Sequence, residues 1–158
     1  MSRKTEGLTV IEVVLVVAVL GVLLGIGFTR ISPPSARLLS GDLKSMLYQA
    51  RYEAVKRNQP VAFVWDPTDE TFYVRLDTAS PDVSAQCGGE ATLVVKRVAE
   101  YPGADVRVDI ASNGVVWLPN GQGRSCTGAP MVAGEIAVSS GSVERLVVIT
   151  MGGKVSIE

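Results

Sequence analysis

The sequence predicts an α+β fold, in which a long N-terminal hydrophobic helix continues into an amphipathic helix that packs on an antiparallel β-sheet domain. Three observations predict this fold. An apolar run fills residues 8–28, a helical stripe of apolar residues follows in 35–57, and apolar residues alternate with polar ones after Pro60. The length of 158 residues suits one folded domain of ordinary size.

The first predicted helix, residues 8–28, is apolar except for Thr9 and Glu12. A helix of this length spans roughly 31 Å, which matches the hydrocarbon core of a bilayer. Arg3 and Lys4 precede the helix and favour a cytoplasmic N-terminus, with the rest of the protein outside the cytoplasm. No A-x-A pattern follows the apolar run, so we expect the helix to stay on the mature protein. A plain membrane anchor leaves Glu12 unexplained, because a carboxylate at this depth costs about 2.5 kcal/mol or more on insertion.

The second predicted helix covers residues 35–57. Two prolines at 33 and 34 interrupt the first helix, and Asn58-Gln59-Pro60 ends the second. Apolar residues at positions 39, 43, 46, 47, 50 and 54 make one stripe along it. Its other faces carry more basic than acidic residues, which suits DNA or lipid headgroups but is explained more simply as a solvated surface with cations near the helix C-terminus.

The remaining sequence alternates with a period of two and predicts strands. Two strands at 61–65 and 72–76, joined by an Asp-Pro-Thr-Asp turn, form a hairpin. We interpret residues 120–123 and the Met-Gly-Gly at 151–153 as turns. Further strands are predicted at 92–99, 105–110, 114–118, 135–138, 145–150 and 154–157.

Composition argues against an enzyme. The sequence has no histidine, which removes Ser-His-Asp and Cys-His catalysis and the commonest zinc and iron ligand sets. We therefore expect no catalytic residues, no metal and no cofactor. The formal net charge of -1 gives no sign of a nucleic-acid-binding protein.

The start of the sequence resembles a class III prepilin signal. Gly7-Leu8-Thr9-Val10-Ile11-Glu12 matches its glycine, hydrophobic residue, threonine, two apolar residues and glutamate, followed by a long apolar run. The resemblance implies that prepilin peptidase cuts after Gly7 and methylates the new amine of Leu8. Glu12 is the natural counter-charge for that amine, within its own subunit or in a neighbouring one, and we expect it to align incoming subunits during assembly.

Later segments resemble the GspH/FimT family of type IV pilin-like proteins. Residues 47–61, with Ala50-Arg51-x-Glu53-Ala54-Val55 at their centre, are similar to the family's helix-to-strand signature. The Trp-Leu-Pro-Asn-Gly at 117–121 and the segment 147–155 resemble its later landmarks. Members are minor pseudopilins of type II secretion systems or minor pilins of type IV pili, so the resemblance implies a pilin fold and a role in filament assembly.

The resemblance also implies partners and a location. The expected partners are prepilin peptidase, other pilin or pseudopilin subunits and an inner-membrane assembly platform. The expected protein is a single-pass inner-membrane protein, with its N-terminus cytoplasmic and its globular domain periplasmic, before it enters a pilus or pseudopilus. Its parts are a leader at 1–7, a transmembrane and filament-core helix at 8–31, and a globular α+β pilin domain at 32–158.

The alternative function is a DNA-binding minor pilin that acts in natural transformation. DNA-binding relatives hold phosphates with a C-terminal Gly-Arg-x-Arg motif, and the matching positions here read Gly153-Lys154-Val155-Ser156. Lysine lacks the bidentate fork of arginine, and Ser156 removes the second charge. Lys154, Arg145 and Arg124 are therefore candidate DNA contacts, and they need to converge to act together.

Cys87 and Cys126 are the only cysteines, and both lie beyond the hydrophobic helix. An even count in an oxidising compartment favours one disulfide between them, with two free thiols as the alternative. A disulfide would close a loop of about 40 residues and contribute roughly 3–4 kcal/mol in the chain-entropy model.

Overall fold

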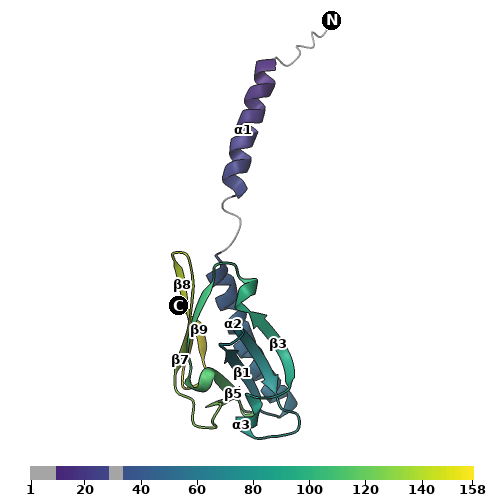
Figure 1. Ribbon diagram of the computed structural model, residues 1–158, viewed down its shortest axis with the longest axis vertical. Helices are drawn as coiled ribbons and strands as arrows, with labels where there is room; N and C mark the ends of the chain where they lie inside the picture. The colour runs from purple at the N-terminus through teal and green to yellow at the C-terminus, as the bar shows by residue number, and fades with distance from the viewer. Residues whose placement is uncertain (1–9, 29–33) are drawn as a thin grey trace, which may run out of the picture. The chain divides into compact units, whose positions relative to one another are not determined.

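The computed structural model describes residues 10–28 and 34–158 (Figure 1). Helix α1 (Val10–Phe28) belongs to one compact unit, and residues 34–158 form another. The side chains of residues 10–21 are exposed, among them Val10 at 82% and Ile11 at 78%. Among the described residues, none of the helices combines the length and the apolar character that a membrane crossing needs. The predicted leader at 1–7 and the first two residues of the expected apolar run lie outside the described residues.

The second unit begins with helix α2 (Ser35–Arg57) and continues mainly as strands. The remaining elements are β1 (Val61–Asp66), β2 (Thr71–Leu76), α3 (Val83–Gln86), β3 (Ala91–Arg97), η1 (Val98–Glu100), β4 (Asp105–Asp109), η2 (Ala111–Asn113), β5 (Gly114–Trp117), β6 (Gly123–Ser125), β7 (Gly134–Ser140), β8 (Val143–Ile149) and β9 (Val155–Ile157).

The strands form two antiparallel sheets. One sheet has the order β3-β2-β1-β5-β6, and the other has the order β4-β7-β8-β9. The predicted helix packed on an antiparallel β-sheet domain is confirmed, and the structure adds that the strands divide into two sheets, because β4 and β5 follow each other in sequence but lie in different sheets. Ser112 and Asn113, between them, have φ angles of 59° and 54°, and this left-handed turn leads the backbone from one sheet to the other.

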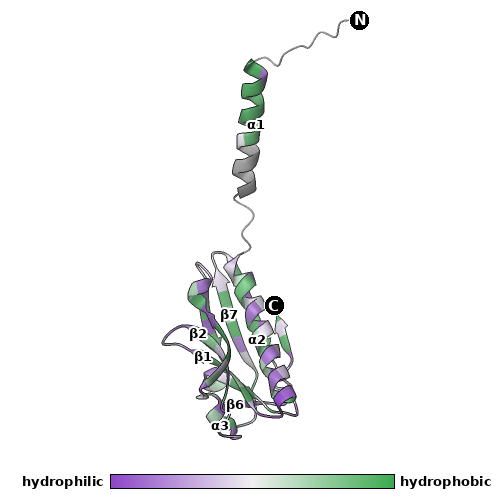
Figure 2. Cartoon of the chain, turned by 90° about the vertical axis from the view of Figure 1, so that its right-hand side faces the viewer, coloured by the Kyte–Doolittle hydropathy of each residue, from purple (hydrophilic) through white to green (hydrophobic). Residues whose placement is uncertain are grey.

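Helix α2 contacts strands of both sheets, so its apolar stripe is the centre of the core. The six positions that the periodicity selected are all buried, which confirms the predicted stripe. Each fully buried leucine contributes roughly 1.5–3 kcal/mol by leaving water. Figure 2 shows hydrophilic residues along the outward side of α2. The buried positions are Leu39, Leu43, Met46, Leu47, Ala50 and Ala54.

The end of α2 lies where the sequence placed it. Asn58 adopts the left-handed conformation, with φ 52° and ψ 37°, and its backbone N–H bonds to carbonyls of the last helical turn. Asparagine tolerates this conformation better than most residues, and it stops the helix before Pro60 begins the turn into β1.

The predicted hairpin is β1 and β2, which pair from Ala62 opposite Arg75 to Asp66 opposite Thr71. The other predicted strands are present with ends shifted by at most two residues. The sequence pattern did not reveal β6 and α3, which are only 3 and 4 residues long and too short for a periodic signal.

Candidate functional site

The residues expected to act in processing and assembly lie at the start of the protein. Gly7 and Leu8 fall outside the described residues. Glu12 lies in the first turn of α1 and is exposed. A carboxylate in the first turn interacts favourably with the positive end of the helix dipole, so Glu12 is compatible with helix formation there.

Arg51 on α2 joins three segments that are distant in the sequence. Its guanidinium carbon lies 5.4 Å from the ring centroid of Trp117, at the end of β5. Its Nη1 donates to the carbonyl oxygen of Gly153, in the turn between β8 and β9, at 3.3 Å. The side chain of Arg51 therefore connects α2 to the end of β5 in one sheet and to the turn between β8 and β9 in the other.

Glycines make this close approach possible. Gly121 and Gly153 have φ angles of +78° and +76°, which other residues rarely adopt. A Cβ atom on Gly121 would lie 3.2 Å from Nη2 of Arg51. A Cβ on Gly153 would lie 2.6 Å from Cζ3 of Trp117, whose ring is fully buried. Both turns therefore need glycine to pack against the arginine and the indole.

A pocket of about 430 Å³ opens beside Arg51, between the loop that joins β5 to β6 and the turn that joins β8 to β9. Arg51 and Arg124 are among its lining residues, together with methionines, a proline and glycines. Among the described residues, no carboxylate lines this pocket. The full lining consists of Arg51, residues 120–124, Pro130, Met131, Met151 and Gly152.

The structure separates the three candidate DNA contacts. Arg124 on β6 lines the pocket, and Lys154 is exposed beside Gly153, whose carbonyl accepts a hydrogen bond from Arg51. Arg145 pairs with Val138 of β7, near the start of β8, whereas the backbone of Lys154 pairs with Thr150, just after the end of β8. At about 3.3 Å per residue, Arg145 and Thr150 lie roughly 17 Å apart along the strand direction.

Sequence reasoning did not select Arg51 as a site residue. The signal that could have found it was present, because Arg51, Trp117 and Gly153 each stand in one of the three segments that resembled the family's landmarks. These three residues meet in space, so the three segments form one packing unit.

The rest of the basic face of α2 is partly neutralised. Nε of Arg57 lies 2.6 Å from a carboxylate oxygen of Glu53, and Nζ of Lys56 lies 3.7 Å from the other oxygen. The hydrogen bond from Arg57 lowers the pKa of Glu53, although burial opposes this effect. These pairs support the interpretation of the helix face as a solvated surface.

A second polar cluster fixes the other end of α2. The hydroxyl of Tyr101 donates to Asp42, and Nζ of Lys96 lies 3.2 Å from the same carboxylate oxygen. Burial, together with the bond to Asp42, raises the pKa of Tyr101 to about 12. The bond to Asp42 also raises the pKa of Lys96. The cluster connects α2 with β3 and the segment after η1.

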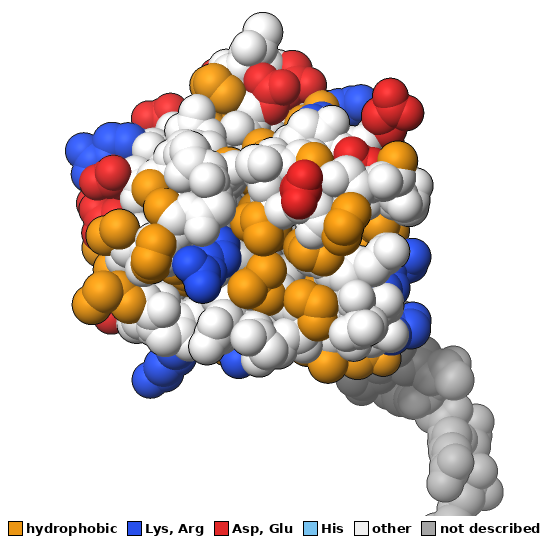
Figure 3. All heavy atoms as spheres, turned by 90° about the horizontal axis from the view of Figure 1, so that it is seen from below, with side chains coloured by type: hydrophobic (Ala, Val, Ile, Leu, Met, Phe, Trp, Pro, Cys, Tyr) orange, Lys and Arg blue, Asp and Glu red, His pale blue; other side chains and the backbone are white. Residues whose placement is uncertain are grey.

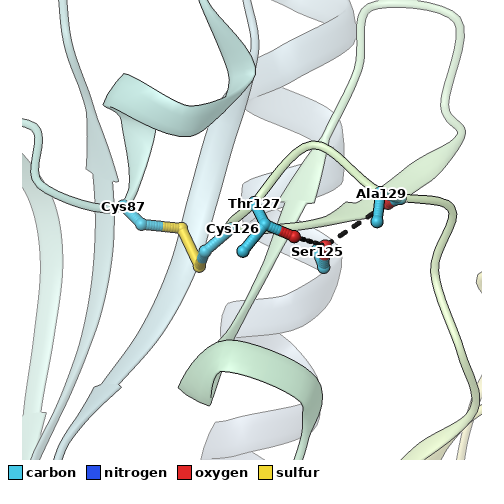
Figure 4. The surroundings of a disulfide bond; sticks show 5 residues. All are labelled: Cys87, Ser125, Cys126, Thr127 and Ala129. Carbon is cyan, nitrogen blue, oxygen red and sulfur yellow. Dashed lines mark hydrogen bonds between the residues drawn. A yellow bond between two sulfur atoms is a disulfide. The ribbon is translucent and has the colours of Figure 1, made fainter.

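Cys87 and Cys126 form a disulfide, in agreement with the expected pairing (Figure 4). Cys87 follows α3, and Cys126 follows the edge strand β6, with a sequence separation of 39. Beside it, the hydroxyl groups of Ser125 and Thr127 lie 2.8 Å apart in hydrogen-bonding contact. No group of three or more metal-ligating side chains is present in the described part of the protein.

Comparisons with known proteins agree with this geometry. A family model described as type II transport protein GspH matches residues 40–153. The type IV minor pilin FimU of Pseudomonas aeruginosa has a similar structure, with a TM-score of 0.56 and 16% identity over 77% of this chain and 91% of its own. The minor pseudopilin EpsH of the Vibrio cholerae type 2 secretion system has a TM-score of 0.58 and 9% identity over 78% of this chain and 96% of its own. No curated protein sequence matches this one.

Proposed function

Because the protein belongs to the family of type II transport protein GspH, we propose that it is a minor pilin or minor pseudopilin. In this role it is cut after Gly7, methylated at Leu8 and assembled through α1 into a filament of the cell envelope. The partners are prepilin peptidase, the assembly platform of the inner membrane and the neighbouring subunits. The protein acts as a building block and carries out no chemistry of its own.

The observation that carries this proposal is the unpaired apolar surface of α1. Its side chains from Val10 to Gly21 are exposed, and apart from Glu12 none of them is polar. A helix that is apolar all round is stable when lipid or other helices cover it. A membrane before assembly and a bundle of neighbouring α1 helices afterwards would each supply that cover.

Glu12 supports the same proposal. Cleavage after Gly7 would create a cationic amine one helical turn before Glu12, and an apolar surrounding makes such an unpaired carboxylate costly. Pairing with the amine of a neighbouring subunit sets the axial position of the incoming subunit, so Glu12 acts mainly in alignment.

Two measurements test the proposal. Mass spectrometry of the protein from its native host should show a mature form that begins at Leu8 with one added methyl group. Filament preparations should then contain the wild-type protein, and much less of it after Glu12→Ala. Glu6→Ala is the matched control, because it removes a carboxylate from the leader, which is absent from the mature protein. A mature form that begins at Met1, or equal entry of Glu12→Ala into filaments, contradicts the proposal.

A deletion strain distinguishes the two kinds of filament. Loss of secreted enzyme activity alone assigns the protein to a type II secretion system, and loss of twitching or transformation assigns it to a type IV pilus. The arrangement of the basic residues gives less support to the alternative, DNA uptake, because Arg145 and Lys154 lie at opposite ends of β8.

A further inference from the structure

A second stripe, on the outward face of α2, stays exposed in the globular unit. Its large side chains are Leu38, Tyr48, Tyr52 and Val55, each between 45% and 62% exposed. The two positions between Leu38 and Tyr48 hold a glycine and a serine, which add little bulk. Spacings of three and four residues place the whole stripe on one side of the helix, as on a surface that another protein covers. The exposed positions that form it are 38, 41, 45, 48, 52 and 55.

Basic side chains flank this stripe. Nζ of Lys44 lies 6.0 Å from the ring centroid of Tyr48, and Arg37 lies two turns before Lys44, on the same side of the helix. Neither Arg37 nor Lys44 forms an ion pair with a described residue, whereas Lys56, farther along, is paired with Glu53. The first half of the stripe therefore presents positive charge beside apolar surface.

The outer face of the sheet β4-β7-β8-β9 has the opposite charge. The valines of β4 pack on the hydrophobic core, so its other residues, Asp105, Arg107 and Asp109, lie on the outer face. The register places Glu135 of β7 directly opposite Asp109, and Glu144 of β8 lies on the same face. None of these four carboxylates forms an ion pair with a described residue. Like charges directly opposite each other in a sheet repel, so a cation at this face is favourable.

The centre of this acidic face is apolar. Leu146 and Val148 of β8 lie there, beside Ala137 of β7. A hollow of about 300 Å³ has Asp109, Glu135 and Val148 among its lining residues, which gives room for side chains of a partner. Figure 3 shows uneven charge on the face that it presents, with acidic side chains mainly in the upper half, basic ones mainly in the lower half and hydrophobic ones between. An apolar centre with acidic margins matches an apolar stripe with basic flanks.

We infer that the outward face of α2 in one copy of this protein docks on the outer face of the sheet β4-β7-β8-β9 in a second copy. Each copy offers both halves of the contact, and charge complementarity makes a second copy the occupant of each face. Arg37 and Lys44 then lie near the carboxylates of β4 and β7, which relieves the repulsion between Asp109 and Glu135. Because the two halves differ, the contact is heterologous and joins copies head to tail.

The first test measures self-association of residues 34–158. This unit contains the whole hydrophobic core and the disulfide, so it has what it needs to fold alone. In sedimentation equilibrium, the average mass should rise above that of the monomer as the protein concentration increases. Raising NaCl from about 50 mM to about 500 mM should weaken the association several-fold, because salt screens exposed charges. Over the same concentrations, ¹H–¹⁵N NMR should show shifts at Tyr48 and Tyr52 on the helix and at Ala137 and Leu146 on the sheet. A unit that stays monomeric, or shifts confined to other surfaces, overturns the inference.

Charge reversals then assign the two faces. The double variant Asp109→Lys, Glu135→Lys has two basic faces, and Arg37→Glu, Lys44→Glu has two acidic ones. Each variant alone should associate at least about tenfold more weakly than wild type, because like charges now meet. An equimolar mixture of the two should associate again, because the unchanged helix of the first meets the unchanged sheet of the second. A mixture of folded variants that stays monomeric contradicts the inference.

A matched control and a lipid arm complete the test. Asp82→Lys, Glu90→Lys makes the same change of net charge at exposed positions between β2 and β3, and it should associate like wild type. Equal weakening by this control means that net charge decides, which overturns the inference. Binding to phosphatidylglycerol vesicles that Arg37→Glu, Lys44→Glu abolishes, without self-association, would assign the helix face to a lipid surface instead. These outcomes do not depend on entry into a filament, so failure of the proposed function leaves the contact standing.

Discussion

Removal of the disulfide should destabilise the globular unit by a predictable amount. The change is the double variant Cys87→Ala, Cys126→Ala, which introduces no new polar group. The bond joins residues separated by 39 positions. In the chain-entropy model, a loop of this size restricts the unfolded state by about 4 kcal/mol at 25 °C. We expect the free energy of unfolding to fall by about 3–4 kcal/mol, because compact structure in the unfolded state reduces the full value.

The assay is urea denaturation of residues 34–158, followed by far-UV circular dichroism, with the oxidised wild type beside the double variant. A reductant should lower the free energy of unfolding of the wild type toward that of the double variant. The double variant is the control, because it has no disulfide and its stability should not respond to the reductant. Stopped-flow kinetics show which state the disulfide acts on. If the bond acts by restricting the unfolded state, its removal should slow folding and leave the unfolding rate nearly unchanged.

Two results would refute this reasoning. A loss below about 1 kcal/mol would mean that the unfolded state is already compact around residues 87–126, so that closing the loop restricts little. A loss that appears wholly as faster unfolding would mean that the bond acts through contacts in the folded state. Faster unfolding would also assign part of the stability to the packing of Cys126 against Gly114. The two residues are close, because a Cβ atom added to Gly114 would lie 2.7 Å from Sγ of Cys126.

Three further predictions concern packing and protonation. Gly153→Ala should lower the free energy of unfolding by about 2–4 kcal/mol, because the new methyl group meets the ring of Trp117 and the residue needs a positive φ. Gly41→Ala should raise it by about 0.5–1 kcal/mol in the same denaturation assay, because open space surrounds this helical position and alanine favours helix; equal effects of the two changes would contradict the packing argument. The pKa of Tyr101, raised from 10.0 to about 12, means that the folded state holds its proton more tightly than the unfolded state, so stability is complete below pH 10 and falls as the pH rises toward 12. Tyr101→Phe cannot donate to Asp42 and has no hydroxyl to titrate, so between pH 10 and 12 its free energy of unfolding should fall by up to about 2–3 kcal/mol less than that of wild type. Parallel pH curves for variant and wild type would show that the hydroxyl does not titrate as described.

The local parts of the fold could be predicted from the sequence, because the spacing of apolar residues, with a period of 3.6 in a helix or 2 in a strand, depends only on residues close together in the sequence. The apolar stripe of α2, its end at Asn58 and the β1–β2 hairpin are of this kind. Pairing between distant strands is a property of the whole core, so the sequence did not reveal that β5 joins β1 while β4 joins β7. Strand β6 consists of Gly-Arg-Ser, which has no alternation to detect.

The candidate site could be predicted only in part, for a similar reason. The motif match selected Lys154, and charge selected Arg124 and Arg145, but the structure places Arg145 near the start of β8, away from the other two. Arg51 was visible as a helix residue, whereas its contacts with Trp117 and Gly153 depend on how two loops fold over α2. The roles of Gly7, Leu8 and Glu12 stay predictions that the proposed experiments address.

The position of the disulfide also has a mechanical consequence. Strands β3, β4, β5 and β6 all lie between its two cysteines, so they belong to one covalent ring. When the protein is pulled from its two ends, the segment between the cysteines cannot extend, because the disulfide bypasses its 39-residue separation. The fully stretched protein is therefore shorter by about 130 Å. Four strands, drawn from both sheets, are thereby shielded from tension. A subunit of a load-bearing filament would lose only its N-terminal and C-terminal elements before the bond itself carried the force.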